Sequence, residues 1–289
     1  MKLEQTLPQS CTFTRRDLIA GAMLLGAVRP AHAWKAALPL AVLDHVNIRV
    51  PDVRRSGEFY AKLFGVQVSR AENAFASAGS RRGELWFVRL GQSSLAISPA
   101  APGEKPGIDH FCFGVEGFNR DAMKQKVAGL NLQIDRTDPP GNNLWTKDPD
   151  GHLIQLSAPQ NPSRAPGAGV GGVLVEPASG AKREPAFQPL RITQLVLSVS
   201  KLDPSASYYR KLLGDEAEEP QKGRFRVGPS ELVLGRASGG EYFRVGVAGF
   251  DPSAVASKLK SLGLASSVVR EKNAVALRDP DGIQVQIGG

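Results

Sequence analysis

Two histidines and a glutamine occupy segments in which apolar residues alternate with other types, as they do in β-strands. The segments read HVNIRV from His45, HFCFGV from His110 and LIQLS around Gln155. Because a strand sends successive side chains to opposite faces, burying the apolar residues leaves these three side chains together on the other face. Imidazole nitrogens and an amide oxygen are donors for divalent cations. The pattern predicts that His45, His110 and Gln155 share one face of a sheet, and these residue types can ligate a divalent cation.

The same alternation brings further side chains beside these three residues. Asn47 and Arg49 follow His45 at steps of two, and Cys112 follows His110 in the same way. We expect these side chains to contact an organic ligand. A second interpretation of the two histidines stays open, in which both rings contact an organic ligand or lie buried and hydrogen-bonded without metal.

A repeated sequence divides the chain into two copies. Residues 45–65 match residues 194–214 at an offset of 149, and residues 147–156 match residues 278–287 at an offset of 131. The second copy has therefore lost about 18 residues, most of them after its first helix. Between the copies, residues 159–189 contain six prolines and five glycines, which is typical of a linker. The GGVLV segment within it could form a short edge strand.

Each copy contains the same order of elements twice. In the first copy we expect helices over 53–64, ended by Gly65, and over 118–130. The expected strands are 43–50, 66–70, 84–90 and 93–98, then 108–115, 131–135, 143–147 and 152–158. His152 follows an Asp-Pro-Asp-Gly turn and is predicted to be a surface residue. The order is βαβββ twice per copy, which gives four modules.

The first 33 residues have the layout of an export signal. Arg15 and Arg16 precede an apolar stretch over 18–28, and Ala31-His32-Ala33 forms a small-x-small cleavage site. This order resembles twin-arginine signals. Eleven apolar residues span only about 16 Å, roughly half of a bilayer core, so they would not anchor the protein. We expect recognition by the twin-arginine translocase, cleavage, and a periplasmic or secreted protein that is not membrane-bound.

The net charge and the cysteine content limit the kinds of ligand and cross-link that we expect for this chain. The net charge is +8, and removing residues 1–33 leaves +6, which is mildly basic. Because no lysine and arginine cluster has interleaved aromatic residues, we expect a small-molecule ligand and no nucleic acid. Cys11 would leave with the signal. Cys112 is then the single cysteine, so the mature chain is expected to have no internal disulfide.

The paired βαβββ modules, the FYAKLFG helix end and the final DPDGHLIQL strand together resemble the vicinal-oxygen-chelate superfamily. This superfamily includes glyoxalase I, bleomycin-resistance proteins and extradiol dioxygenases. The resemblance implies an α+β fold of two tandem domains, residues 41–158 and 190–289, in which paired modules form an open, cup-shaped mixed sheet. It also implies metal ligands on the first and last strands of each module. Those positions hold His45, His110 and Gln155, so the resemblance implies a site for Fe²⁺, Mn²⁺ or Zn²⁺ made by these three residues. The repeat places Ala96 at the fourth position.

The second domain lacks the predicted ligands. Its inward positions read Gln194, Val233, Tyr242 and Gln286, with Arg244 beside them. No imidazole or carboxylate is among these residues, so we predict no metal there. The domain is expected to be degenerate, packing on the first or binding an organic ligand through Gln194, Tyr242, Arg244 and Gln286. An inward Arg244 would suit a carboxylate or a phosphate.

Glutamates that the family carries at its metal site are replaced in this sequence, which argues against two activities of the family. An isomerase of the glyoxalase I type needs a carboxylate base beside the metal, and both family glutamates are replaced, by Ala96 and Gln155. Extradiol dioxygenases end in Tyr-x-x-Asp-Pro-x-Gly-x-x-x-Glu, and here Trp145 and Gln155 stand for the tyrosine and the glutamate. Trp145 is therefore expected to contact the ligand. That branch also places its metal in the second domain.

Two functions stay open from the sequence. The first is a metal-dependent enzyme, dioxygenase-like or lyase-like, that acts on a small organic substrate, and the paired histidines favour it. The second is a non-catalytic binding protein of the bleomycin-resistance kind, which the missing acid favours. The two domains could close a site within one chain or across a homodimer.

Overall fold

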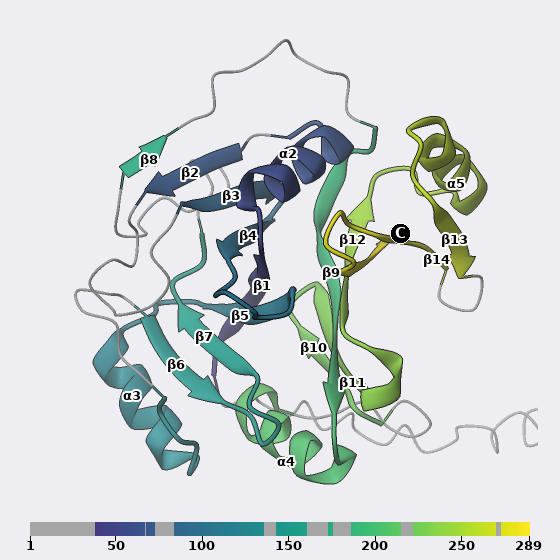
Figure 1. Cartoon of the computed structure of the whole chain (residues 1–289). Helices are drawn as coiled ribbons and strands as arrows, with labels where there is room; N and C mark the ends of the chain where they lie inside the picture. Colours follow the sequence, from purple (N-terminus) through teal and green to yellow (C-terminus); the bar gives the residue numbers. More distant parts are fainter. Residues whose placement is uncertain are drawn as a thin grey trace, which may run out of the picture. The chain divides into compact units, whose positions relative to one another are not determined.

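Two mixed β-sheets, one from each copy of the repeat, make up the part of the chain that the computed structural model describes (Figure 1). That part comprises residues 38–66, 68–72, 84–135, 143–160, 173–175, 186–214, 222–269 and 273–289. The predicted export signal lies outside the described residues, as does most of the linker. The expected α+β architecture with cup-like sheets is confirmed.

The first sheet is built from two modules that meet at its centre. Its elements are β1 (Leu40–Val50), α2 (Val53–Phe64), β2 (Val68–Glu72), β3 (Leu85–Leu90), β4 (Ser93–Pro99), β5 (Gly107–Val115), α3 (Arg120–Gly129), β6 (Asn143–Lys147) and β7 (Leu153–Ser157). The strand order is β6-β7-β5-β1-β4-β3-β2-β8. The first strands of the modules, β1 and β5, pair antiparallel. The expected edge strand in the linker is β8 (Val173–Val175), which pairs with β2.

The second sheet repeats this arrangement with a shorter first module. Its elements are β9 (Pro189–Val199), α4 (Leu202–Leu213), β10 (Arg224–Val227), β11 (Ser230–Arg236), η1 (Ala237–Gly239), β12 (Tyr242–Val247), α5 (Pro252–Ser261), β13 (Ser266–Val269), β14 (Ala274–Arg278) and β15 (Gln284–Gly288). The strand order is β10-β11-β9-β12-β15-β14-β13. Among the described residues, no strand corresponds to β2, in agreement with the shorter sequence.

Local capping explains where the helices of the first sheet begin and end. The Asp52 carboxylate accepts the Arg55 N–H ahead of α2, and Gly65 ends that helix with φ 58°. The second helix starts two residues later than expected because Asn119 caps it by accepting the Ala122 N–H. The strand expected over 131–135 was wrong, since Ile134 forms only an isolated bridge with Thr146.

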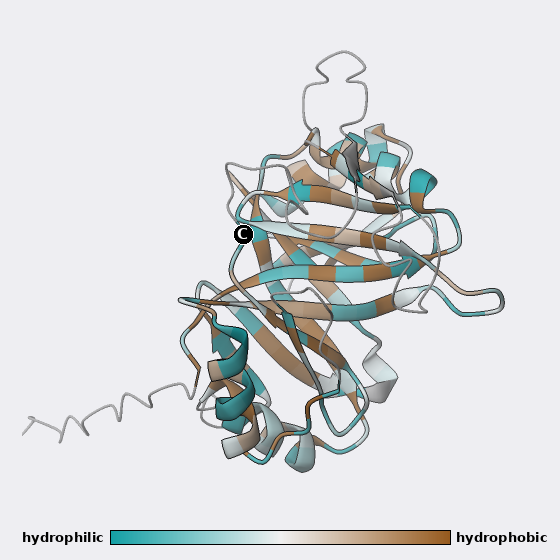
Figure 2. Cartoon of the chain, turned by 90° about the vertical axis from the view of Figure 1, so that its left-hand side faces the viewer, coloured by the Kyte–Doolittle hydropathy of each residue, from teal (hydrophilic) through white to brown (hydrophobic). Residues whose placement is uncertain are grey.

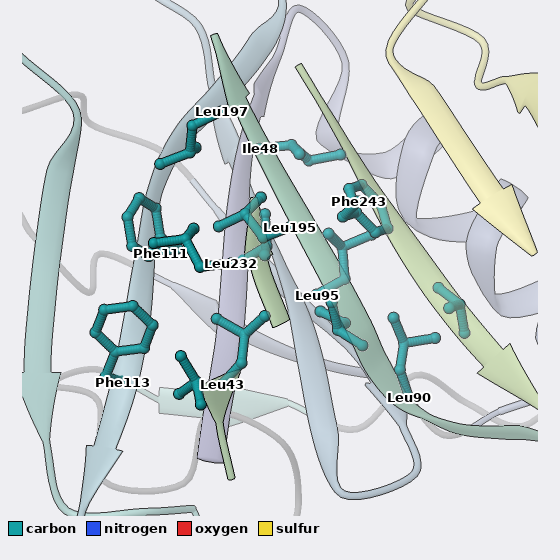
Figure 3. Packing of buried hydrophobic residues seen from close by; sticks show 14 of the residues in the cluster. Leu43, Ile48, Leu90, Leu95, Phe111, Phe113, Leu195, Leu197, Leu232 and Phe243 are labelled. Atoms are coloured by element: carbon teal, nitrogen blue, oxygen red, sulfur yellow. The ribbon is translucent and has the colours of Figure 1, made fainter. Parts of the chain in front are cut away.

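One apolar core serves both sheets. Figure 3 shows side chains of the first sheet, including Ile48, Leu95 and Phe111, next to side chains of the second, including Leu195 and Phe243. All five are at most 1% exposed. Apolar stretches alternate with polar ones along the strands of both sheets (Figure 2). The apolar faces that were expected under the helices therefore also pack against the other sheet.

Two glycine turns allow the sheets to approach closely. A Cβ atom on Gly91, in the turn between β3 and β4, would lie 2.0 Å from the Leu190 carbonyl oxygen. A Cβ atom on Gly228, in the turn between β10 and β11, would lie 2.0 Å from the Ala41 carbonyl oxygen. Both glycines have positive φ, +62° and +55°, so any other residue would be strained there as well. The two contacts join equivalent positions of the two copies of the repeat.

Reciprocal hydrogen bonds join the Asp-Pro-Asp-Gly turn of each copy to the first helix of the other. The Tyr209 hydroxyl on α4 donates to Asp148 (2.9 Å), and the Tyr60 hydroxyl on α2 donates to Asp279 (2.8 Å). Both tyrosines are fully buried. The third residue of each turn is also held across the interface: Ser205 donates to Asp150, and Ser56 donates to Asp281. The repeated turn sequence thus serves to dock the copies.

The two tyrosine contacts are not equal, because Asp148 has a further partner. The Asp148 Oδ2 atom also accepts from His152 (2.7 Å), whereas Tyr60 is the one side chain that contacts the Asp279 Oδ2 atom among the described residues. Tyr60→Phe should therefore lower the free energy of unfolding by about 2 kcal/mol and Tyr209→Phe by about 1 kcal/mol. Urea denaturation of both variants measures the difference. Equal losses, or a larger loss for Tyr209→Phe, would show that His152 does not support Asp148.

His152 links the two copies, so its prediction as a surface residue was wrong. Its Nδ1 atom contacts Asp148 (2.7 Å) and its Nε2 atom contacts Glu241 of the other copy (2.7 Å). The side chain is 16% exposed. Burial alone would lower the pKa of His152, but the hydrogen bonds and charges of the two carboxylates outweigh burial and raise the pKa to about 10.

The raised pKa of His152 makes the stability depend on pH. The imidazolium contributes its full stabilisation below the unfolded pKa of 6.5, and the contribution is lost as pH rises towards the folded pKa of about 10. Between these two pKa values, the contribution of His152 to the free energy of unfolding should fall by up to roughly 1.4 kcal/mol for each unit by which the pH rises. The slope should be absent in His152→Gln. Denaturation curves from pH 6 to 10 measure it, and identical slopes in both proteins would rule out a charged His152.

The described residues contain no helix long and apolar enough to cross a membrane.

Candidate functional site

The register of the first sheet brings the three predicted ligands around one position. In β5, Cys112 lies directly opposite His45 of β1 and Gln155 of β7. The second histidine, His110, is two residues before Cys112 and lies opposite Asn47. Residues opposite each other in a sheet share a face, so all five side chains point the same way. The face predicted from alternation is therefore the face that the structure shows.

The rings on this face are close to one another. The His45 and His110 ring centres are 5.6 Å apart, with an interplanar angle of 81°. Trp145, opposite Gln155 in β6, packs edge-on against His110 at 4.8 Å. Both histidines are 7% exposed and Trp145 is 2% exposed. The two imidazoles are thus held in a buried, partly aromatic environment.

Each histidine is held by the aspartate that precedes it. The His45 Nδ1 atom contacts Asp44 at 2.8 Å, and the His110 Nδ1 atom contacts Asp109 at 2.8 Å. In a regular strand, neighbouring side chains point to opposite faces and could not meet in this way. Residues 44 and 109 each stand as the extra residue where the register between β1 and β5 shifts. These two β-bulges turn each aspartate towards its histidine.

The carboxylates fix the orientation of the imidazoles. Asp44 Oδ1 accepts from His45, while Asp44 Oδ2 accepts the Gln160 N–H at 2.6 Å. Asp109 Oδ2 contacts His110, and Asp109 Oδ1 contacts Arg49 at 3.4 Å. In both rings, Nδ1 is the nitrogen engaged by a carboxylate, so Nε2 is the nitrogen directed to the other side. Sequence reasoning missed both aspartates, although Asp-His occurs at the same place in the LDHVNIRV and IDHFCFGV segments.

Gln155 is nearly buried and has no protein partner among the described residues. The residue is 8% exposed, and its amide makes no hydrogen bond within the part of the chain that the structure describes. A ligand on this face would supply the missing partner.

Two of the other expected ligand-contacting residues are already engaged. Arg49 pairs with Glu104 (3.0 Å) and donates to the Ile108 carbonyl (3.2 Å). Asn47 accepts from Ser98 (2.8 Å) through its Oδ1 atom. These contacts make both side chains part of the wall of the site.

Cys112 belongs to a second set of donors that could hold a metal. The ligand atoms of Asp44, His45 and Cys112 all lie within 4.8 Å of one another. Both Asp44 oxygens already accept hydrogen bonds. Burial raises the pKa of the Cys112 thiol well above its usual value, and its sulfur contacts the Ser157 hydroxyl at 3.2 Å. This set of side chains is therefore a weaker candidate for binding a cation than the pair of histidines.

An apolar cluster adjoins the polar residues on the same face. It consists of Ala71, Leu85, Phe87 and Ala96, which are separate from the main core and at most 3% exposed. Ala96 lies opposite Asn47, so the cluster borders the histidines directly.

The second sheet carries different chemistry at the equivalent positions. Gln194 and Gln286 flank Arg244 in the register, and Tyr242 occupies the next row, as expected. Glu231, which is not among the inward residues predicted from the sequence, lies opposite Gln194 on this face. The described residues of this face include no histidine.

Comparison with known proteins assigns the first copy to a family. Residues 42–156 match the model of the Glyoxalase/Bleomycin resistance protein/Dioxygenase superfamily. The chain is 30% identical over 130 residues to the mitochondrial methylmalonyl-CoA epimerase of Homo sapiens, covering 40% of this chain and 73% of that protein. It is 26% identical over 123 residues to the virulence protein STM3117 of Salmonella typhimurium, covering 40% and 82%.

Solved structures resemble most of the chain in fold. The halotolerant catechol dioxygenase BphC superposes with a TM-score of 0.60 at 17% identity, covering 86% of both chains. The Mn(II)-bound glyoxalase from Novosphingobium aromaticivorans superposes with a TM-score of 0.58 at 15% identity, covering 86% of this chain and 82% of the other. At these identities the likeness concerns the fold.

Proposed function

We propose that this chain, which belongs to the Glyoxalase/Bleomycin resistance protein/Dioxygenase superfamily, binds a divalent metal ion between His45 and His110 and acts as an enzyme on a small organic substrate. The observation that carries the proposal is the pair of Asp–His contacts, Asp44 with His45 and Asp109 with His110. Metal-binding histidines commonly donate their second nitrogen to a carboxylate, which fixes the ring and strengthens it as a ligand.

The ring geometry fits one shared ion. A ligating imidazole nitrogen lies about 2.1 Å from a metal and its ring centre about 3.2 Å, so two rings on one ion have centres roughly 4.5–6 Å apart. The 5.6 Å between His45 and His110 lies in this range. The amide of Gln155, which makes no hydrogen bond with the described residues, would give a third, neutral donor. Fe²⁺, Mn²⁺ and Zn²⁺ all accept such nitrogen and oxygen donors.

A divalent ion at this place would act as a Lewis acid towards an oxygen atom of the substrate. The residues of the chain orient and shield it: Asp44 and Asp109 hold the imidazoles, and Trp145 packs against His110. The apolar cluster around Ala96 would hold an apolar part of the substrate.

The reaction is not expected to be a proton transfer at carbon. The human relative is named an epimerase, and epimerisation removes and returns such a proton, which needs a general base. Ala96 and Gln155 offer none, and Asp44 and Asp109 are engaged by the histidines. A dioxygenase-like or lyase-like reaction agrees better with these residues.

The missing acid supports a second candidate, a binding protein that holds a small molecule without turning it over. The substitution Gln155→Glu separates the two functions. At a metal site it supplies an anionic donor, so metal affinity should rise several-fold and added Mn²⁺, Fe²⁺ or Zn²⁺ should raise the melting temperature more than in the wild type. In a ligand-binding site without metal, the substitution adds a buried charge and should lower the free energy of unfolding by about 1–3 kcal/mol. A variant that is destabilised and rescued by no metal would contradict the metal site.

A matched control distinguishes the two donor sets. Cys112→Ser should leave the response to metal unchanged if the ion lies between the histidines, whereas His110→Ala should remove it. The reverse pattern would assign the ion to Asp44, His45 and Cys112 instead.

We also propose export by the twin-arginine route, which rests on the sequence of residues 1–33 alone. Replacing Arg15 and Arg16 together by lysine should leave the precursor in the cytoplasm, as measured by cell fractionation and immunoblotting. If the variant is still exported, the signal belongs to the general secretory route.

A further inference from the structure

A cavity of about 380 Å³ lies on the second sheet, away from the proposed metal site. It is lined by Thr193, Gln194, Arg226, the turn from Gly228 to Ser230, Glu231, Arg244 and Gly289. Its volume is within the range of small-molecule sites. Its polar side chains come from three neighbouring strands, β9, β11 and β12, and from β10 at its rim.

Arg244 brings a positive charge to this cavity. Its Nε and Nη2 atoms donate to the same oxygen of Gln286, at 3.2 Å and 2.9 Å. Gln286 is neutral, and Arg244 makes no ion pair with any described residue. Burial lowers the pKa of Arg244, while the charge of Glu231 and a hydrogen bond with Tyr242 act in the opposite direction.

The carboxylate of Glu231 forms its ion pair with another arginine and not with Arg244. It accepts from Arg224 at 3.0 Å and from Gln194 at 3.1 Å, so its own charge is balanced by Arg224. Arg226 is exposed at the rim and forms no ion pair within the described part of the chain. Two arginines therefore face the cavity beyond the balanced pair.

We propose that this cavity binds a small organic anion through a carboxylate or phosphate group. The Arg244 guanidinium has donors beyond those used by Gln286, and guanidinium groups bind both kinds of anion in a forked geometry. Arg226 would close over the ligand from the rim. The site does not depend on a metal, because Thr193 and Gln194 replace the Asp44 and His45 of the first sheet.

Inorganic phosphate and succinate serve as probes, with sodium chloride at equal ionic strength as the reference. Calorimetric titration and thermal melting of the mature chain should show saturable binding of at least one probe. Arg244→Gln should weaken binding at least tenfold and Arg226→Gln several-fold. Arg236→Gln is the matched control, because Arg236 is an exposed arginine on β11 outside the cavity, and it should bind as the wild type does.

Arg226→Gln keeps the test decisive if Arg244→Gln fails to fold, because the Arg226 side chain is exposed. His110→Ala should retain anion binding, which separates this proposal from the metal site. Absence of saturable binding in the wild type, or equal binding by Arg226→Gln, Arg244→Gln and the wild type, would overturn the proposal.

Discussion

The apolar face of each sheet needs a partner, and the other sheet supplies it. Ile48 and Phe111 on one side, with Leu195 and Phe243 on the other, are removed from water in a single core. Burial of this kind has no direction, so it does not by itself fix how two twisted sheets are aligned. The alignment comes from directional contacts repeated at both ends of the interface. These are the tyrosine hydroxyls on the buried turn carboxylates and the glycine turns against opposing carbonyl oxygens.

Because the core and these directional contacts hold the two sheets together, the residues on the opposite face of each sheet can differ between the copies. The bulge at Asp44 has an equivalent in the second sheet at Thr193, where the register between β9 and β12 also shifts. The first sheet uses the bulge to direct a carboxylate at His45. The second has Thr193 and Gln194 there, and it carries Arg244 where the first sheet has Cys112. One backbone thus supports a candidate metal centre in one copy and a candidate anion site in the other.

Much of the fold follows from sequence pattern because its signals are local or repeated. The repeat predicts the modules, and the alternation in β1 and β5 predicts the shared face of His45 and His110. Alternation fails at the bulges, since it places Asp44 and Asp109 on the wrong face, and a register shift leaves no mark in apolar periodicity. His152 was misjudged for another reason. Its partner Glu241 is remote in sequence, and the interface that joins them is a tertiary feature.

We expect the two carboxylate-held imidazoles to share one metal ion. Metal analysis measures this in the wild-type protein and in a His45→Ala, His110→Ala double variant, each purified without chelator and then equilibrated with Mn²⁺, Fe²⁺ or Zn²⁺. The wild type should hold close to one equivalent of metal and the double variant none above background. Absence of bound metal from the wild type, or equal amounts in both proteins, would rule out the shared metal site.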